Sequence, residues 1–225
     1  ISICAPLEKF KNKVRVSGGA LKPFEITVPG DISSAAFFMA AASIIKGSRI
    51  EIAGVGVNPT RAGILKVLES MGAHIEIKNA AGFELGEPAA DIIVESSELS
   101  GIKVPPDLIP EMIDELPVLA VAATQAEGET VVTGASELRV KETDRIKATV
   151  GQLKRMGADI EELPDGFVVR GPVSLKGAEV ESFKDHRMAM SLAVAGITAE
   201  GETIIADAEC VDISFPGFWE ILERL

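Results

Sequence analysis

The chain has 225 residues, of which 47% are hydrophobic and 25% are charged, so it can bury one sizeable core or two small ones. Its formal net charge of -12 and pI near 4.7 disfavour broad contact with nucleic acids or anionic membranes, because a negative field repels phosphate. Any bound anion therefore needs a local cluster of cations.

The sequence contains no apolar run of the roughly 18 residues that a membrane-spanning helix needs. It starts at Ile1 without a methionine and resembles no signal or transit peptide, so we expect it to begin inside a longer protein. Cys4 and Cys210 lie far apart and lack nearby histidines, which predicts reduced, structural thiols in a cytoplasmic protein.

An internal repeat with a spacing of roughly 70 to 85 residues organises the chain. Each copy has an aspartate, an apolar helix that ends near a glycine, a short strand and a second helix. Aspartate accepts hydrogen bonds from the free N–H groups of a helix start, and glycine adopts the left-handed conformation that ends a helix. The aspartates are Asp31, Asp114 and Asp185, the glycines are Gly47, Gly128 and Gly201, and the second helices end at Met71, Met156 and Leu225.

Short apolar or alternating runs predict strands around these helices. They lie at 14–16, 48–52, 75–77, 91–94, 130–132, 167–169 and 203–205. Each copy therefore reads as a βαβαββ unit. Because the alanine-rich helices are apolar nearly all round, the sequence predicts an α/β fold of three such repeats, with helices packed inside small sheets.

The third copy ends at Leu225 without the two closing strands of the others. An unpaired sheet edge is prone to aggregation, so we expect a segment from elsewhere in the complete protein to finish this sheet. Residues 1–28 read as the tail of a preceding, mostly absent domain, with Pro29-Gly30 as a hinge. The domain itself is predicted over 29–225.

The segment 139–145, with the sequence RVKETDR, precedes a helix whose apolar residues fall on one face. Thr143 or Asp144 can cap this helix, which places Arg145 in its first turn. The helix dipole opposes a cation there by about 0.3 to 1 kcal/mol, unless a bound anion reverses the effect. A solvated charge run is the alternative interpretation. The apolar face consists of Ile146, Val150, Leu153 and Met156.

The segment Asp185-His186-Arg187-Met188 repeats this anomaly, with cations directly after a capping aspartate. Two such helix starts in corresponding parts of a repeat suggest that both act on one anion. Arginine can bind a carboxylate or phosphate with two parallel hydrogen bonds, and histidine can also move a proton near neutral pH.

Asp114 lies in the segment Ile113-Asp114-Glu115-Leu116-Pro117, at the helix start that corresponds to Asp31 and Asp185. It is either a helix cap or a base that accepts a proton from a substrate hydroxyl, and the sequence leaves both possibilities open.

Other polar or aromatic residues favour structural roles. His74 is expected on an exposed strand, and Phe215, Phe218 and Trp219 are expected in the core because of their helical spacing.

Five segments occur in the order found in the 5-enolpyruvylshikimate-3-phosphate synthases, whose C-terminal domain this chain resembles over essentially its whole length. The segment RVKETDR together with the later DHRM is highly specific to that family, whereas the related UDP-N-acetylglucosamine enolpyruvyl transferases generally lack the former. The segments are GDISSAA at 30–36, DELP at 114–117, RVKETDR at 139–145, DHRMAM at 185–190 and SFP at 214–216.

The resemblance implies an enolpyruvyl-transferase-type domain. The implied reaction moves the enolpyruvyl group of phosphoenolpyruvate to the 5-hydroxyl of shikimate 3-phosphate and releases phosphate, through a tetrahedral addition-elimination intermediate. This reaction belongs to the shikimate pathway, which leads to chorismate and the aromatic amino acids. The resemblance implies no metal or organic cofactor, a monomer, and the N-terminal domain of the same chain as partner.

The resemblance also implies residue roles. Asp114 accepts the proton of the target hydroxyl, and Lys141 helps to bind shikimate 3-phosphate. Glu142 exchanges a proton with the methylene carbon. The carboxylate and phosphate of phosphoenolpyruvate, where family members also bind glyphosate, are expected to bind Arg145, His186 and Arg187.

The chain departs from the family pattern at Ile213, where some members have a phosphate-contacting lysine. The family's N-terminal substrate-binding residues are absent, so we expect this chain alone to be inactive. A UDP-sugar enolpyruvyl transferase and a non-catalytic RNA-binding module are the alternatives, and acidic charge disfavours the second.

Overall fold

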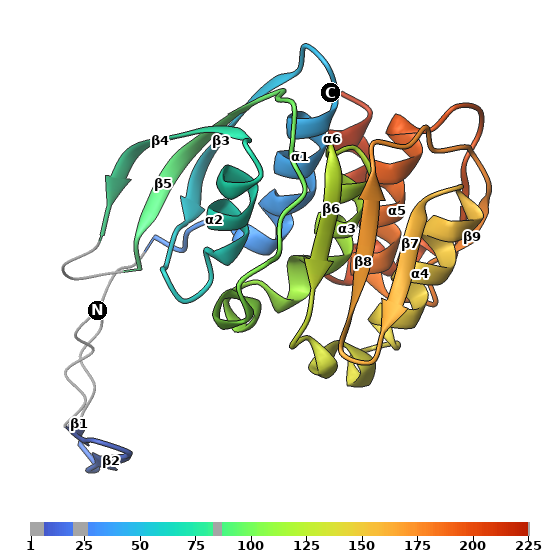
Figure 1. Ribbon diagram of the computed structural model, residues 1–225. Coiled ribbons are helices and arrows are strands. Elements are labelled where there is room, and N and C mark those ends of the chain that lie inside the picture. The colour runs from blue at the N-terminus through green and yellow to red at the C-terminus, as the bar shows by residue number, and fades with distance from the viewer. Residues whose placement is uncertain (1–6, 20–26, 83–86, 225) are drawn as a thin grey trace.

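The computed structural model describes residues 7–19, 27–82 and 87–224. Three units, each with its own small sheet, lie side by side around a shared interior (Figure 1). None of the helices in these described ranges is long and apolar enough to cross a membrane.

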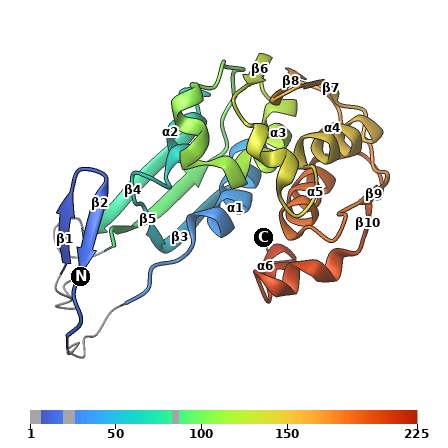
Figure 2. The same ribbon diagram turned by 90° about the horizontal axis from the view of Figure 1, so that it is seen from below.

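Three inner helices form the centre of the molecule. They are α1 (Ile32–Ile44), α3 (Leu116–Thr124) and α5 (His186–Thr198), and each contacts the other two. Seen from below, they lie together between the sheets and α6 (Phe218–Leu222) (Figure 2). Nearly every residue of α1 and all of α3 are buried, which confirms the predicted fold of inner helices and small outer sheets.

The first unit follows the predicted order closely. Its sheet contains β3 (Arg49–Gly56), β5 (Ala89–Glu95) and β4 (His74–Ala81), with β5 in the middle and antiparallel to both neighbours. Asp31 caps α1 through the amides of Ser33 and Ser34, and the short helix α2 completes the unit. Helix α2 spans Gly63–Ser70.

The second unit repeats this arrangement. Its antiparallel sheet has the order β6 (Gly128–Val132), β8 (Gly166–Gly171) and β7 (Asp159–Leu163). Helix α4 (Arg145–Arg155) is capped by Asp144, one of the two candidates from the sequence, which accepts from the Lys147 amide at 3.0 Å. Three 3-10 helices precede the inner and outer helices of this unit, η1 (Pro106–Glu111), η2 (Ile113–Glu115) and η3 (Ser136–Val140).

The third unit has the smallest sheet. β9 (Glu179–Glu181) pairs in parallel with β10 (Ile204–Ala206), and η4 (Ala208–Ile213) leads to α6. Among the described residues, the third unit has no counterpart of the antiparallel strands that complete the first two sheets. The predicted last helix, from Pro216 to Leu225, is shorter at both ends.

An aromatic cluster joins the third unit to the first. Phe218 is fully buried and its ring contacts those of Phe37, Phe38, Phe215 and Trp219 at centroid distances of 5.1 to 6.2 Å. The prediction of core positions is confirmed for Phe218, while Phe215 and Trp219 are partly buried against the core.

The structure corrects three details of the sequence analysis. The strands β7 and β9 were not predicted, since Asp159–Leu163 carries three carboxylates and Glu179–Glu181 is only three residues long. The leading strands of the first two units are reduced to isolated bridges at Gly30 and Lys103. The cap position of α3 belongs to Glu115, whereas Asp114 lies in η2 and caps no helix.

Residues 7–16 form a two-stranded hairpin near the start of the chain. It pairs β1 (Leu7–Phe10) with β2 (Lys13–Val16) in antiparallel register and contains the strand predicted at 14–16. Cys4 lies outside the described residues, and Cys210 is a buried free thiol whose pKa is raised by burial.

Candidate functional site

Charged side chains from three helix starts converge on Arg145, the first residue of α4. They come from η2 before α3, from the loop before α4 and from the start of α5. Arg145 and Asp185 are separated by 40 residues in the sequence and form a buried ion pair. The folding of the repeat therefore brings the two anomalous helix starts together, as the sequence predicted.

The guanidinium of Arg145 is 1% exposed and all three of its nitrogens donate to carboxylates. Nε donates to Asp185 at 2.7 Å, Nη1 to Asp114 at 2.9 Å, and Nη2 to Glu142 at 2.6 Å. Burial alone lowers the pKa of Arg145, but its hydrogen bonds and ion pairs with Asp185 more than offset burial, so the pKa lies above its ordinary value. Arg145 is therefore a fixed cation that holds three carboxylates in place.

Asp114 is half-buried and faces three cations. Besides the bond from Arg145, its Oδ1 lies 3.6 Å from Lys141 Nζ, and its Oδ2 lies 3.6 Å from Arg187 Nη2. Burial raises the pKa of Asp114, but the charges of Arg187, Lys141 and Arg145 together outweigh burial and hold it below its ordinary value. Asp114 is thus ionised at neutral pH and can accept a proton.

Arg187 holds its guanidinium between two carboxylates without a close hydrogen bond to either. Nη2 is 3.6 Å from Asp114, and Nη1 is 3.8 Å from Glu115 Oε1. The side chain is 15% exposed. Its N–H groups are therefore available to an anion that approaches from the exposed side, in contrast to those of Arg145.

The remaining predicted site residues line the same cluster. Lys141 Nζ also contacts Glu137 at 3.2 Å, and Glu142 is exposed apart from its bond with Arg145. His186 is partly buried, and its pKa is lowered by burial and then by the charge of Arg187. The imidazole of His186 is consequently neutral at neutral pH.

Sequence reasoning missed Glu115, which is 1% exposed and whose Oε1 has no hydrogen-bond partner in the part of the chain that the structure describes. Burial raises its pKa above the ordinary value. The sequence does carry a sign that Glu115 is not an ordinary helix cap, namely Pro117. A proline at the second helical position lacks the N–H group that a capping side chain would bind.

Several other charged residues lie outside this cluster. Arg139 donates to the carbonyls of Leu163 and Pro164 and to Asp144, so it ties the segment before α4 to the second sheet. His74 lies on β4 with its side chain 82% exposed, which confirms the predicted surface position. Ile213 is 84% exposed and contributes no polar group. In the parts of the chain that the structure describes, no group of three or more candidate ligands is placed to hold a metal ion.

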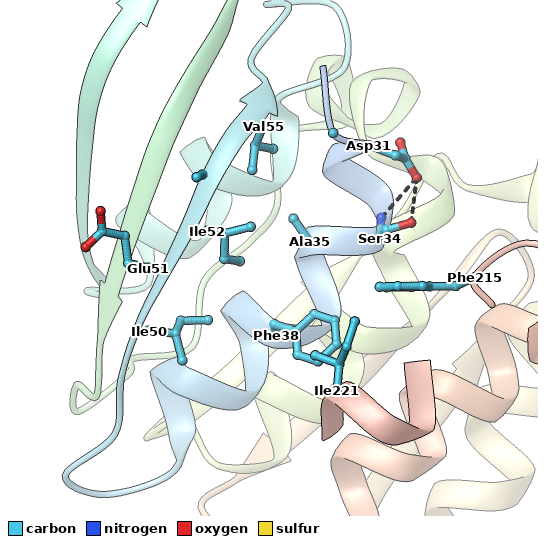
Figure 3. A pocket seen from close by; sticks show the side chains of 12 residues that line it. Asp31, Ser34, Ala35, Phe38, Ile50, Glu51, Ile52, Val55, Phe215 and Ile221 are labelled. Atoms are coloured by element: carbon cyan, nitrogen blue, oxygen red, sulfur yellow. Dashed lines mark hydrogen bonds between the residues drawn. The ribbon is translucent and has the colours of Figure 1, made fainter. Parts of the chain in front are cut away.

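A separate apolar pocket of about 460 Å³ lies between α1, β3 and the aromatic cluster. Figure 3 shows Ile50, Ile52, Phe38 and Ile221 around it, with Asp31 at one end beside the start of α1. None of the residues that surround Arg145 lines this pocket. The charged cluster and the apolar pocket are thus two distinct features.

Comparison with known proteins places the chain in one family. Residues 3–222 match the family model described as EPSP synthase (3-phosphoshikimate 1-carboxyvinyltransferase). A 3-phosphoshikimate 1-carboxyvinyltransferase of Syntrophomonas wolfei is 57% identical over 209 residues, which are 92% of this chain and 49% of that protein. The protein of that name from Desulforamulus reducens is 50% identical over 222 residues, or 98% of this chain and 52% of the relative.

A solved structure agrees with these relatives. The EPSP synthase of Acinetobacter baumannii superposes with a TM-score of 0.93 at 43% identity, over 99% of this chain and 52% of that one. The enolpyruvyl transferase NikO of Streptomyces tendae is 18% identical, with a TM-score of 0.72, and shares the fold. The chain spans about half the length of the curated relatives that it matches. By its sequence and its structure, the chain belongs to the EPSP synthase family.

Proposed function

We propose that the complete protein containing this chain is a 3-phosphoshikimate 1-carboxyvinyltransferase. It transfers the enolpyruvyl group of phosphoenolpyruvate to the 5-hydroxyl of shikimate 3-phosphate, with release of phosphate. Membership of the family and the names of the relatives support this function. The observation that carries it is the position of Asp114, an ionised carboxylate surrounded by Lys141, Arg145 and Arg187.

The proposed reaction has an addition and an elimination. Asp114 takes the proton of the 5-hydroxyl while the hydroxyl oxygen bonds to the central carbon of phosphoenolpyruvate. In the same step Glu142 gives a proton to the methylene carbon. In the elimination, Glu142 takes a proton back from the resulting methyl group, the bond to the phosphate oxygen breaks, and Asp114 returns its proton to the departing phosphate. The two carboxylates accept from different nitrogens of Arg145, Nη1 and Nη2.

The cations of the cluster bind the anionic reactants in this proposal. Lys141 binds shikimate 3-phosphate, while Arg187, Arg145 and the neutral imidazole of His186 bind phosphoenolpyruvate. Arg187 has free N–H groups, but Arg145 must exchange Glu142 or Asp114 for a substrate oxygen. Closure by a second domain excludes water and strengthens each contact, from about 1 kcal/mol for a unit pair at 4 Å in water to about 4 at intermediate dielectric.

The surrounding organisation is part of the same proposal. Residues 29–225 form the C-terminal domain, residues 1–28 are the tail of the N-terminal domain, and that domain supplies the rest of the substrate site. The protein works as a cytoplasmic monomer without a metal or organic cofactor, and the chain of 225 residues alone does not turn over.

An assay of phosphate release by the complete protein tests this function. We expect release only when phosphoenolpyruvate and shikimate 3-phosphate are both present, and none from the 225-residue chain alone. Release with UDP-N-acetylglucosamine in place of shikimate 3-phosphate would instead identify the related transferase class. Salt-sensitive RNA binding without any response to shikimate 3-phosphate would contradict both enzyme assignments.

A further inference from the structure

The starts of the three inner helices differ in how they use their capping carboxylates. Asp31 accepts from two amides of α1, and Asp185 accepts from two amides of α5. Glu115 occupies the same position before α3 but forms no side-chain cap bond. Pro117 has no N–H at the second helical position, so one of the usual donors is missing there. The carboxyl of Glu115 is therefore not engaged by its own helix.

The surroundings of Glu115 come from the other two units. Its side chain is 1% exposed, and Oε1 lacks a hydrogen-bond partner among the described residues. The Ser33 side chain of α1 interacts with the carboxyl and lowers its pKa, and Arg61 donates to the Ser33 hydroxyl at 2.8 Å. On the other side, Arg187 of α5 lies 3.8 Å from Oε1. Buried carboxyl oxygens are rarely left without a hydrogen-bond partner, so the position of this oxygen needs an explanation.

Position and charge connect Glu115 to the anion site. Arg187 Nη1 faces Glu115 while Nη2 faces the neighbouring Asp114, so two consecutive residues orient one guanidinium. A shift of about 1 Å brings Nη1 and Oε1 to hydrogen-bond distance. The hydrogen bond from Arg61 holds in place the Ser33 hydroxyl that interacts with this carboxyl.

We infer that Glu115 is a positioning residue that orients the guanidinium of Arg187 for a small carboxylate- or phosphate-bearing anion, with Ser33 and Arg61 as its supports. Glu115 does not touch the reacting atoms in this inference; it acts through Arg187. The inference rests on the proposed function for the identity of that anion, phosphoenolpyruvate.

Steady-state kinetics of the complete enzyme with Glu115→Gln tests the inference. The amide keeps the shape of the side chain and removes its charge. We expect the KM for phosphoenolpyruvate to rise about tenfold, the effect of losing one charge-assisted contact. The kcat and the KM for shikimate 3-phosphate should stay close to wild type. The matched control is Glu111→Gln, because Glu111 lies nearby but pairs with Lys66, and it should leave all three constants unchanged.

The pH profile separates positioning from a merely structural role. Glu115, whose pKa is raised by burial, faces Arg187, Arg61, Asp114 and Ser33. The arginines stay charged and Asp114 is already ionised, so Glu115 is the titrating group among them. The ratio of KM in Glu115→Gln to KM in wild type should therefore grow as the pH rises above the ordinary carboxyl range. Substrate titration affects both enzymes and cancels in the ratio.

A second variant keeps the test decisive if Glu115→Gln fails to fold. Ser33→Ala removes the hydroxyl group that lowers the pKa of Glu115, so the pH dependence of the KM for phosphoenolpyruvate should move to higher pH. An active wild type with a pH-independent KM ratio, or a Ser33→Ala profile that does not move, overturns the positioning role. A wild type that releases no phosphate from the two substrates overturns the proposed function instead.

Discussion

Arg145 shows how a single buried cation organises a cluster of carboxylates from three helix starts. Two of its carboxylate contacts, with Asp114 and Glu142, are to the proposed proton-transfer residues, and the third, with Asp185, is fully buried. A desolvated arginine with several carboxylates is stable only while every partner is present, because a lone buried charge is costly. The same side chain therefore supports both stability and the alignment of the site.

Removal of Arg145 is expected to destabilise the protein strongly. Arg145→Met leaves the buried Asp185 without its counter-charge, and we expect a loss of about 3 to 5 kcal/mol in the free energy of unfolding at neutral pH. Urea denaturation measures this loss. The control is Arg170→Met, since Arg170 pairs with carboxylates on the exposed face of the second sheet and should leave the midpoint nearly unchanged. Equal losses in the two variants would contradict the special role of burial.

The proposed proton-transfer and binding roles predict different kinetic effects in the complete protein. Asp114→Asn and Glu142→Gln should mainly lower kcat, because each removes a group that moves a proton. Arg187→Ala should mainly raise the KM for phosphoenolpyruvate, because it removes a contact to the bound anion. Steady-state kinetics with each substrate varied in turn measures both effects. Near-normal turnover in both carboxamide variants would be incompatible with the proton-transfer assignments.

Within the elements, close approach between strands decides which glycines are irreplaceable. In the second sheet, a Cβ on Gly166 of β8 would lie 1.9 Å from the carbonyl oxygen of Val132, the last residue of β6. Gly151 lies inside α4, where a Cβ would meet open space. The first glycine is required by packing, whereas the second only weakens its helix.

Alanine at these two glycines should therefore have effects of opposite sign. Gly166→Ala forces β8 away from β6 and should destabilise the protein. Gly151→Ala should stabilise it by about 0.5 to 1 kcal/mol, since alanine restricts the unfolded chain and fits the helix. Thermal and urea denaturation of the two variants measure both changes. A stable Gly166→Ala protein would mean that β6 and β8 separate easily at this end.

The molecule as a whole carries a net charge of -12, so the ionisation of each carboxyl group in the site depends on its local burial and on the cations beside it. Asp114 and Glu115 are consecutive, yet their pKa values move in opposite directions. Asp114 is half-buried and faces three cations, while the deeper burial of Glu115 outweighs its contacts with Ser33 and Arg187. The fold thus places two carboxyl groups side by side, one with a lowered pKa and one with a raised pKa.

This contrast predicts opposite pH dependences of stability. A lowered pKa in the folded state stabilises the protein above the ordinary pKa of Asp114, and that contribution is lost as the pH falls through the lowered value. Asp114→Asn should therefore cost most at neutral pH and least in acid. The raised pKa of Glu115 destabilises the folded state as the pH rises through and above its ordinary value, so Glu115→Gln should gain stability relative to wild type over that range.

Urea denaturation of both variants and the wild type over a pH series measures these slopes. Glu129→Gln, at an exposed position on β6, serves as the control and should show neither trend. Parallel pH profiles for the two variants would contradict the opposite shifts.

The sequence alone determined the repeat, the apolar inner helices, the caps Asp31 and Asp185, and the two helix starts that carry cations. It narrowed the cap of α4 to Thr143 or Asp144. These features depend on contacts within about one helical turn, or on periodicity along one element, and both can be read from neighbouring residues. The exposed strand β7 and the very short β9 escaped prediction, because their pairing partners rather than their own residues define them.

Only the tertiary structure decided which charges meet. The packing of three inner helices sets Arg145 against Asp185, forty residues away, and brings Asp114 within reach of cations from two other helix starts. It also shows that Glu115, and not Asp114, occupies the cap position of α3. The carboxyl of Glu115 is buried beside Arg187. Burial and distances across the units are properties of the packed molecule, so the electrostatics of the site could not be derived from residue order.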